Sequence, residues 1–134
     1  MSKSLIQVAN QSSQNVNDNS IISLGSVQRR YGCNLRLSGN AIECVGEGYY
    51  EIDGTVSVAP TVAGPVTVAV YNNGVQVPGI ISYGSVSTAG NAVTLPLVGT
   101  VRQGCCCDSA DNLTIVLISG AGVVNNVSFR VVKS

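Results

Sequence analysis

The stretch that decides the fold runs from Gly48 to Gly79 and reads GYYEIDGTVSVAPTVAGPVTVAVYNNGVQVPG. Its first part, 49–59, alternates: one face carries Tyr50, Ile52, Gly54, Val56 and Val58, and the other carries Tyr49, Glu51, Asp53, Thr55 and Ser57. Alternation with a period of two is typical of a strand that buries one face. A second strand follows, and its apolar side chains are again alternate residues. The stretch therefore predicts an antiparallel β scaffold, and nothing in it resembles a reaction centre.

Turn residues divide this stretch and the rest of the chain into short strands. Pro60 and Gly64-Pro65 bracket a loop, and Asn72-Asn73-Gly74 is a tight-turn signal, because Asn and Gly tolerate a positive φ. Pro78-Gly79 closes the short return strand 75–77. Other strand candidates are 20–25, the hairpin 33–37 and 41–45 around Ser38-Gly39-Asn40, and then 80–87, 92–101, 113–119 and 123–133.

Proline and spacing refine this picture. Pro96 lacks an amide hydrogen for a central ladder, so it places 92–101 at a sheet edge or a bend. No segment shows sustained helical periodicity. Roughly eight to ten short strands at regular spacing favour a sandwich, a jelly roll or a barrel.

The first twenty residues are more polar than the rest. Leu5, Ile6 and Val8 make a short strand-like piece, but 10–19 has almost nothing to bury. We therefore expect 1–20 to be an N-terminal arm or docking segment. Residues 21–134 then form a single β-sandwich domain, which is long enough to bury a core of its own.

Composition points to a protein that buries part of its surface against other chains. Of 134 residues, 45% are hydrophobic and only 10% are charged, with seven basic and seven acidic residues. Charge depletion with apolar enrichment is typical of obligate interfaces. The sequence has no basic stripe that would indicate nucleic-acid binding, and none of its apolar runs reaches the ~18 residues of a membrane helix. The opening segment has no apolar run of signal-peptide length, so we expect synthesis in a cytosol with reduced thiols.

Catalysis has few candidates. The chain has no histidine, which removes Ser-His and Cys-His nucleophile pairs and the usual metal ligand. Glu47, Glu51 and Asp53 form a small acidic cluster. It has three interpretations: a solvated outer face, a calcium site, or a carboxylate pair for glycoside hydrolysis. We expect no enzyme activity and no cofactor.

Two other groups of residues are candidates for contacts. Cys105, Cys106 and Cys107 are buried packing residues, or they pack around the symmetry axis of an oligomer, or they bind a metal or form a disulfide with Cys33 or Cys44. Tyr49, Tyr71 and Tyr83 are candidates to face a glycan, since tyrosine rings stack on sugars. The alternative is that these tyrosines bury the ring and expose only the hydroxyl.

Four segments resemble the jelly roll of tumour necrosis factor and the complement globular heads: GYYEIDGTVSV, VTVAVYNNGVQVPG, DNLTIVLIS and VSFRVVK. The opening LIQVANQSSQNVNDNSIISLGSVQRRYGCNLRLSGNAIECVGEGYYEI is similar to small virion proteins of tailed phages of gut Firmicutes. The chain departs from the larger family in its aromatic-poor core, where Phe129 is the only phenylalanine.

The resemblance implies a ten-stranded, two-sheet antiparallel jelly roll that assembles as a tight homotrimer. It also implies a non-enzymatic structural role in a phage virion, as capsid decoration or head fibre, attached to other virion proteins. The alternative is a carbohydrate-binding or host-adhesion module for surface glycans. Candidate contact loops are 60–65, 87–91 and 120–126.

Overall fold

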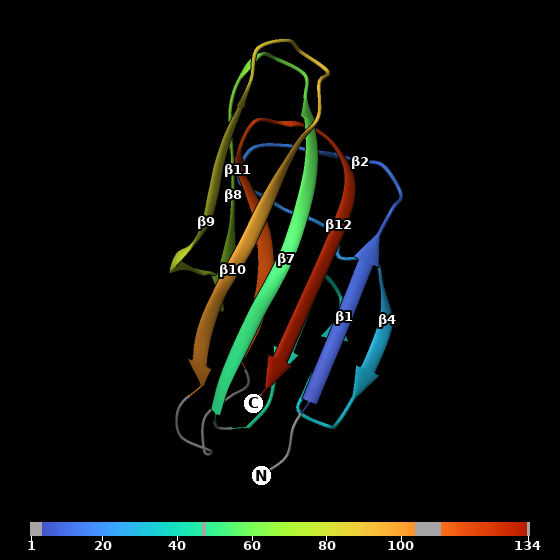
Figure 1. Cartoon of the computed structure of the whole chain (residues 1–134), viewed down its shortest axis with the longest axis vertical. Helices are drawn as coiled ribbons and strands as arrows, with labels where there is room; N and C mark the ends of the chain where they lie inside the picture. The colour runs from blue at the N-terminus through green and yellow to red at the C-terminus, as the bar shows by residue number, and fades with distance from the viewer. Residues whose placement is uncertain (1–3, 47, 104–110, 134) are drawn as a thin grey trace.

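The computed structural model describes residues 4–46, 48–103 and 111–133 as two antiparallel sheets packed face to face (Figure 1). Nothing helical in these ranges is long and apolar enough to cross a membrane. The strands are β1 (Ser4–Asn10), β2 (Gln14–Val16), β3 (Ser20–Ile21), β4 (Ser26–Tyr31), β5 (Leu35–Ser38), β6 (Ala41–Cys44), β7 (Gly48–Pro60), β8 (Gly64–Asn72), β9 (Val75–Val86), β10 (Val93–Gln103), β11 (Asp111–Ser119) and β12 (Gly122–Lys133).

Strand order identifies the sandwich as a jelly roll. Sheet A has the order β10-β7-β12-β1-β4, with β2 pairing β12, and sheet B has the order β5-β6-β11-β8-β9, with β3 pairing β11. The two main paths hold five strands each, which gives the ten strands that the resemblance implied; the two- and three-residue strands β3 and β2 are additions. The expectation of a two-sheet antiparallel jelly roll is confirmed.

The core lies between the sheets and is built from the alternating residues. The predicted apolar face of β7 and residues Val66, Val68 and Val70 of β8 are all buried. Phe129 of β12 is fully buried opposite Gly54, where an added Cβ would lie 2.9 Å from its ring. Burial of each such side chain stabilises the fold by about 1.5–3 kcal/mol, so this face holds the two sheets together.

The described strands of the N-terminal segment are part of sheet A. Ser4–Asn10 is β1, which pairs with β12 on one side and β4 on the other in sheet A. Ile6 and Val8 are fully buried, because the alternation in this short segment places them against the core. Gln14–Val16 also pairs with β12. The domain therefore includes β1 and β2, and deletion of 1–20 would remove an interior strand.

Edge strands show where sequence patterns succeed and where they fail. Pro96 lies in β10, which is an edge of sheet A, so that prediction is confirmed. β4 was missed, because all six of its residues are exposed and its sequence SVQRRY therefore has no apolar alternation.

The candidate strand 20–25 is strand only at Ser20–Ile21. Ile22 and Leu24 beyond it are buried outside any strand.

The return strand after the Asn-Asn-Gly turn is longer than expected. Pro78-Gly79 does not end it: β9 runs from Val75 to Val86. Its register against β8 jumps from Tyr71↔Gln76 to Ala69↔Ile81, so the proline and Gly79, with φ of 86°, lie in a bulge. Proline cannot donate to the ladder, and the bulge accommodates it while pairing resumes beyond it.

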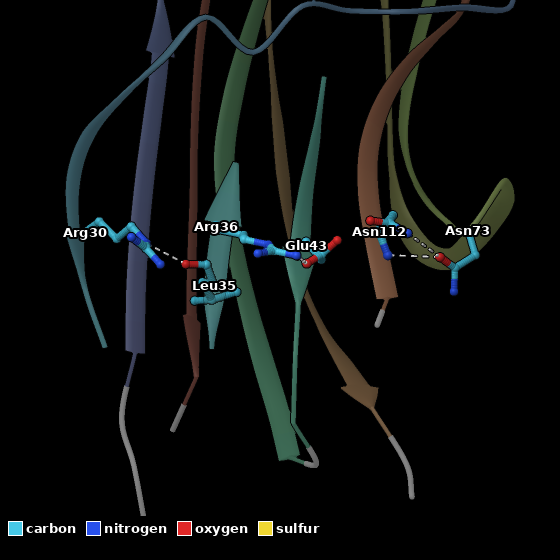
Figure 2. A network of polar contacts seen from close by, with 6 residues as sticks. All are labelled: Arg30, Leu35, Arg36, Glu43, Asn73 and Asn112. Atoms are coloured by element: carbon cyan, nitrogen blue, oxygen red, sulfur yellow. Dashed lines mark hydrogen bonds and ion pairs between the residues drawn. The ribbon is translucent and has the colours of Figure 1, made fainter. Parts of the chain in front are cut away.

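Polar contacts hold the turns at one end of sheet B (Figure 2). Asn73 has a φ of 52°, and its Oδ1 accepts hydrogen bonds from the backbone N (3.0 Å) and Nδ2 (3.3 Å) of Asn112. Arg36 pairs with Glu43 across the β5–β6 hairpin, and Arg30 Nε donates to the carbonyl of Leu35 at 2.7 Å. The predicted turn at Asn72-Asn73-Gly74 is confirmed, and Asn112 fixes it to β11.

Candidate functional site

Sheet A turns one face away from the core, and this surface, which we call face A, is the main candidate site. Its side chains alternate with the buried residues of the same strands, so sequence and pleat together fix their direction. Face A consists of Leu5 and Gln7 from β1, Arg29 and Tyr31 from β4, Tyr49, Glu51 and Asp53 from β7, Val98, Thr100 and Arg102 from β10, and Arg130 and Val132 from β12.

Strand register arranges face A in rows that cross the whole sheet. One row contains Thr100, Glu51, Val132, Leu5 and Tyr31. The next row contains Val98, Asp53, Arg130, Gln7 and Arg29. Directly opposed side chains on one face of a sheet lie close enough to interact. Face A is therefore a continuous surface in which apolar and charged side chains are mixed.

Several apolar side chains of face A remain open to solvent. The exposed fractions of Val98, Tyr49 and Tyr31 are 64%, 56% and 53%. A shallow depression between β10 and β1 is lined by Leu5, Glu51, Val98, Thr100, Arg130 and Val132, among others. A second one is lined by Gln7, Asp53, Gly54, Thr55, Ser128 and Arg130. Such shallow, partly apolar surfaces suit contact with another macromolecule better than they suit a small substrate.

Five of the twelve side chains of face A are charged: Arg29, Glu51, Asp53, Arg102 and Arg130. Arg130 and Asp53 form an ion pair at 3.3 Å, with side chains 49% and 60% exposed. Because both are solvated, the pair contributes less than about 1 kcal/mol. The guanidinium carbon of Arg102 lies 5.8 Å from the ring centroid of Tyr49. Glu51 and Asp53 are both exposed here. Within the described residues, no three His, Cys, Asp or Glu side chains are grouped so that they could hold a metal ion.

The three candidate glycan-facing tyrosines lie on different faces. Tyr49 belongs to face A. Tyr83 and Tyr71 point outward from sheet B, where Tyr83 is 72% exposed and Tyr71 is partly buried. The three rings therefore do not form one platform, although Tyr83 is accessible by itself. A glycan contact at any of them stays a prediction.

The run Cys105–Cys107 and residue Glu47 lie outside the described residues. The interpretations of the three cysteines, including a place on a symmetry axis, therefore stay predictions. Of the other two cysteines, Cys33 is exposed and Cys44 is buried.

The candidate contact loops meet at one end of the sandwich. Figure 1 shows the β7–β8, β9–β10 and β11–β12 connections at the end opposite to the start of β1 and the end of β12. The amide of Thr61 donates to Ala121 O at 3.1 Å, and that of Gly90 donates to Pro60 O at 2.9 Å. Asp18 Oδ1 accepts from the amide of Ala121 at 3.0 Å. The third loop is shorter than expected, because β12 already begins at Gly122.

Sequence reasoning missed the apolar row of face A. The outward positions of β7 are predicted correctly, but Leu5 lies in the segment expected to be an arm, and Tyr31 lies in β4, where no strand is predicted. The pairing of Leu5 with Val132 and with Tyr31 depends on strand order. One signal was available: Val98 lies out of phase with the buried Leu95 and Leu97.

No family model and no curated protein match the chain. Solved structures do match it. Murine APRIL is 14% identical with a TM-score of 0.77, over 99% of this chain and 100% of that chain. The globular domain of zebrafish complement 1qA is 8% identical with a TM-score of 0.70, over 95% and 94%. Vertex protein P5 of PRD1 is 13% identical with a TM-score of 0.60, over 98% and 96%.

These likenesses establish the fold, which is the jelly roll that tumour-necrosis-factor ligands and complement globular heads also have. The family resemblance in the sequence is confirmed at this level. Identities of 8–14% carry no residue-level correspondence. The similarity to small phage virion proteins stays a prediction.

Proposed function

We propose that this protein is a non-enzymatic structural subunit of a phage virion, which assembles as a homotrimer through face A and attaches to the particle as capsid decoration or head fibre. The fold is compatible with this role, since a protein named for a vertex of PRD1 has it too. The trimer is what the sequence resemblance implies. Face A offers the surface through which subunits would meet.

The observation that carries the proposal is the exposure of Val98, Tyr49 and Tyr31 on the outward face of sheet A. A stable interface needs about 800 Å² from each partner. That is a modest share of the 6665 Å² of this monomer. Burial of one exposed valine contributes up to about 1.5–3 kcal/mol, so several apolar contacts per boundary suffice for a stable oligomer.

The first measurement is the absolute mass in solution by light scattering, with and without reductant. We expect three times the 13.7 kDa of one chain, unchanged by reductant. A monomer at all concentrations would refute assembly through face A. A trimer that dissociates on reduction would show that disulfide bonds between cysteines, and not contacts of face A, hold the subunits together.

A matched pair of variants locates the interface. Val98→Asp places a carboxylate on face A, and we expect it to be monomeric. Val62→Asp makes the same change at a valine of the β7–β8 loop that is also mostly exposed, 74% against 64%, and we expect it to remain trimeric. A trimeric Val98→Asp variant would exclude this part of face A from the boundary.

Virion attachment needs a separate test. The chain should be present in purified particles by mass spectrometry, in copy numbers divisible by three. Its absence from particles would refute the virion role while it leaves the trimer untouched.

A glycan-binding role is the second candidate, and the accessible ring of Tyr83 favours it. Neither β8 nor β9 contains a charged residue, which suits a neutral sugar. Titration with a glycan panel should then give binding that Tyr83→Ala abolishes. Binding that the substitution leaves unchanged would exclude this surface.

A further inference from the structure

Two charged side chains of face A, Arg29 and Glu51, differ from the other described charges because neither has a partner among the described residues. Arg36 pairs with Glu43, Arg130 with Asp53, Arg102 with the Tyr49 ring, Arg30 with the Leu35 carbonyl and Asp18 with the Ala121 amide, and Lys133 also has a contact. One unmatched cation and one unmatched anion thus lie on the same surface of the monomer.

The two groups are too far apart to pair within one chain. Glu51 is on β7 and Arg29 is on β4, so β12 and β1 lie between them. Three steps of about 4.8 Å separate the strands by about 14 Å. Glu51 and Arg29 also lie in neighbouring rows, which adds about 7 Å along the strands.

A ring of identical subunits brings these two sides together. In a closed ring, each copy uses two different patches, one toward each neighbour. When face A points toward an axis parallel to its strands, the β10 side of one copy approaches the β4 side of the next. Glu51 lies one strand in from the β10 edge, and Arg29 lies on the β4 edge. The geometry therefore places complementary charges at the two halves of each boundary, and the offset of one row, about 7 Å along the axis, is within the combined reach of the two long side chains.

We propose that Glu51 of one copy and Arg29 of the next copy form an ion pair across each subunit boundary, and that this pair fixes the register between neighbours. The inference rests on the proposed assembly through face A. The planar guanidinium of arginine can hold a carboxylate by two parallel hydrogen bonds, which constrains orientation as well as distance. Leu5 and Tyr31 flank this position and would exclude water from the pair, which strengthens it.

A charge-reversal cycle tests the pair. Arg29→Glu and Glu51→Arg should each raise the concentration at which the trimer dissociates by about tenfold or more, since like charges then face each other. The double variant restores an opposite pair, and we expect dissociation within about threefold of the wild type. Rising salt should weaken the wild-type trimer more than the Arg29→Ala/Glu51→Ala double variant.

A matched control uses the internal pair of sheet B. Arg36→Glu, Glu43→Arg and their double variant make the same charge changes away from face A, and the trimer should dissociate at the wild-type concentration. Thermal melts of all variants check that each one folds. The pair would be refuted if Arg29→Glu and Glu51→Arg each left the trimer intact. It would also be refuted if the double variant dissociated as the sum of the two single effects predicts. A wild-type monomer would refute the proposed assembly as well.

Discussion

The outward faces of the two sheets differ in how far their apolar side chains are exposed to solvent. On sheet B, the row Ile21, Val116, Ala69 and Ile81 is apolar throughout. Ala69 is fully buried and Val116 is 7% exposed, although both point away from the core. On face A, Val98 and Tyr31 remain more than half exposed, as Ile21 does at the end of the sheet B row.

The difference lies in which residues flank the apolar ones. Across sheet B, side chains of Ile21 and Ile81 stand beside Val116 and Ala69 in the same row and shield them within the monomer. On face A, the central positions are the charged Glu51, Asp53 and Arg130, and the exposed apolar residues lie toward the edges. Apolar residues at the centre of a row are therefore shielded by their neighbours, whereas those toward the edges of either sheet, Ile21 and Tyr83 included, remain exposed.

The largest effect should come from Phe129→Ala, because both faces depend on the core beneath them. The substitution removes the ring that fills the space opposite Gly54 and should lower the free energy of unfolding by about 3–5 kcal/mol. Urea denaturation followed by circular dichroism measures this loss. Phe129→Leu is the matched control with a smaller loss. An unfolding midpoint close to that of the wild type would contradict the assignment of this ring to the core.

Ala69→Asp tests directly whether sheet B covers its own outward residues. The new carboxylate would be buried without a cation, so we expect the free energy of unfolding to fall by about 3 kcal/mol or more. Val98→Asp, on the exposed side of the comparison, should change the monomer by less than about 0.5 kcal/mol. Both are measured by denaturation at concentrations where the protein is monomeric. Equal losses would remove the distinction between the two faces.

Much of the fold follows from local patterns in the sequence. Alternation in 49–59, the valines of β8 and the Asn-Asn-Gly turn each predict one element correctly, since burial of one face enforces the period of two. The pattern fails where that constraint is absent. β4 is wholly exposed, and β1 is short enough for its polar continuation to dominate the segment.

The candidate site could be predicted only in part. The outward phase of β7 places Tyr49, Glu51 and Asp53 on one surface from sequence alone. Their neighbours come from β12, β1 and β4, which are distant in the chain and become adjacent only through the order of the sheet. Arg29 and Glu51 could not be identified as unmatched charges without that order, because pairing is a long-range property.

Asn73→Ala should cost about 1–2 kcal/mol, because alanine is strained at a φ of 52° and cannot accept from the amide of Asn112. This turn sets the register of β9, which supplies Ile81 to the shielded row of sheet B. Asn73→Gly is the control: glycine adopts this φ without strain but, like alanine, has no side-chain oxygen to accept from Asn112. Thermal melts of both variants separate the two contributions. Identical melting temperatures for both would show that strain at this position contributes nothing.

The smallest effects should distinguish the two ion pairs that the described residues show. The Arg130–Asp53 pair on face A is solvated on both sides, and its coupling energy in a double-mutant cycle should be about 0.2–0.5 kcal/mol. The Arg36–Glu43 pair has one partner only 18% exposed, so its coupling should approach about 1 kcal/mol. Both cycles are measured on the monomer with alanine substitutions. If assembly covers face A, the order reverses in the trimer, because water is then excluded from Arg130 and Asp53 while Arg36 remains solvated.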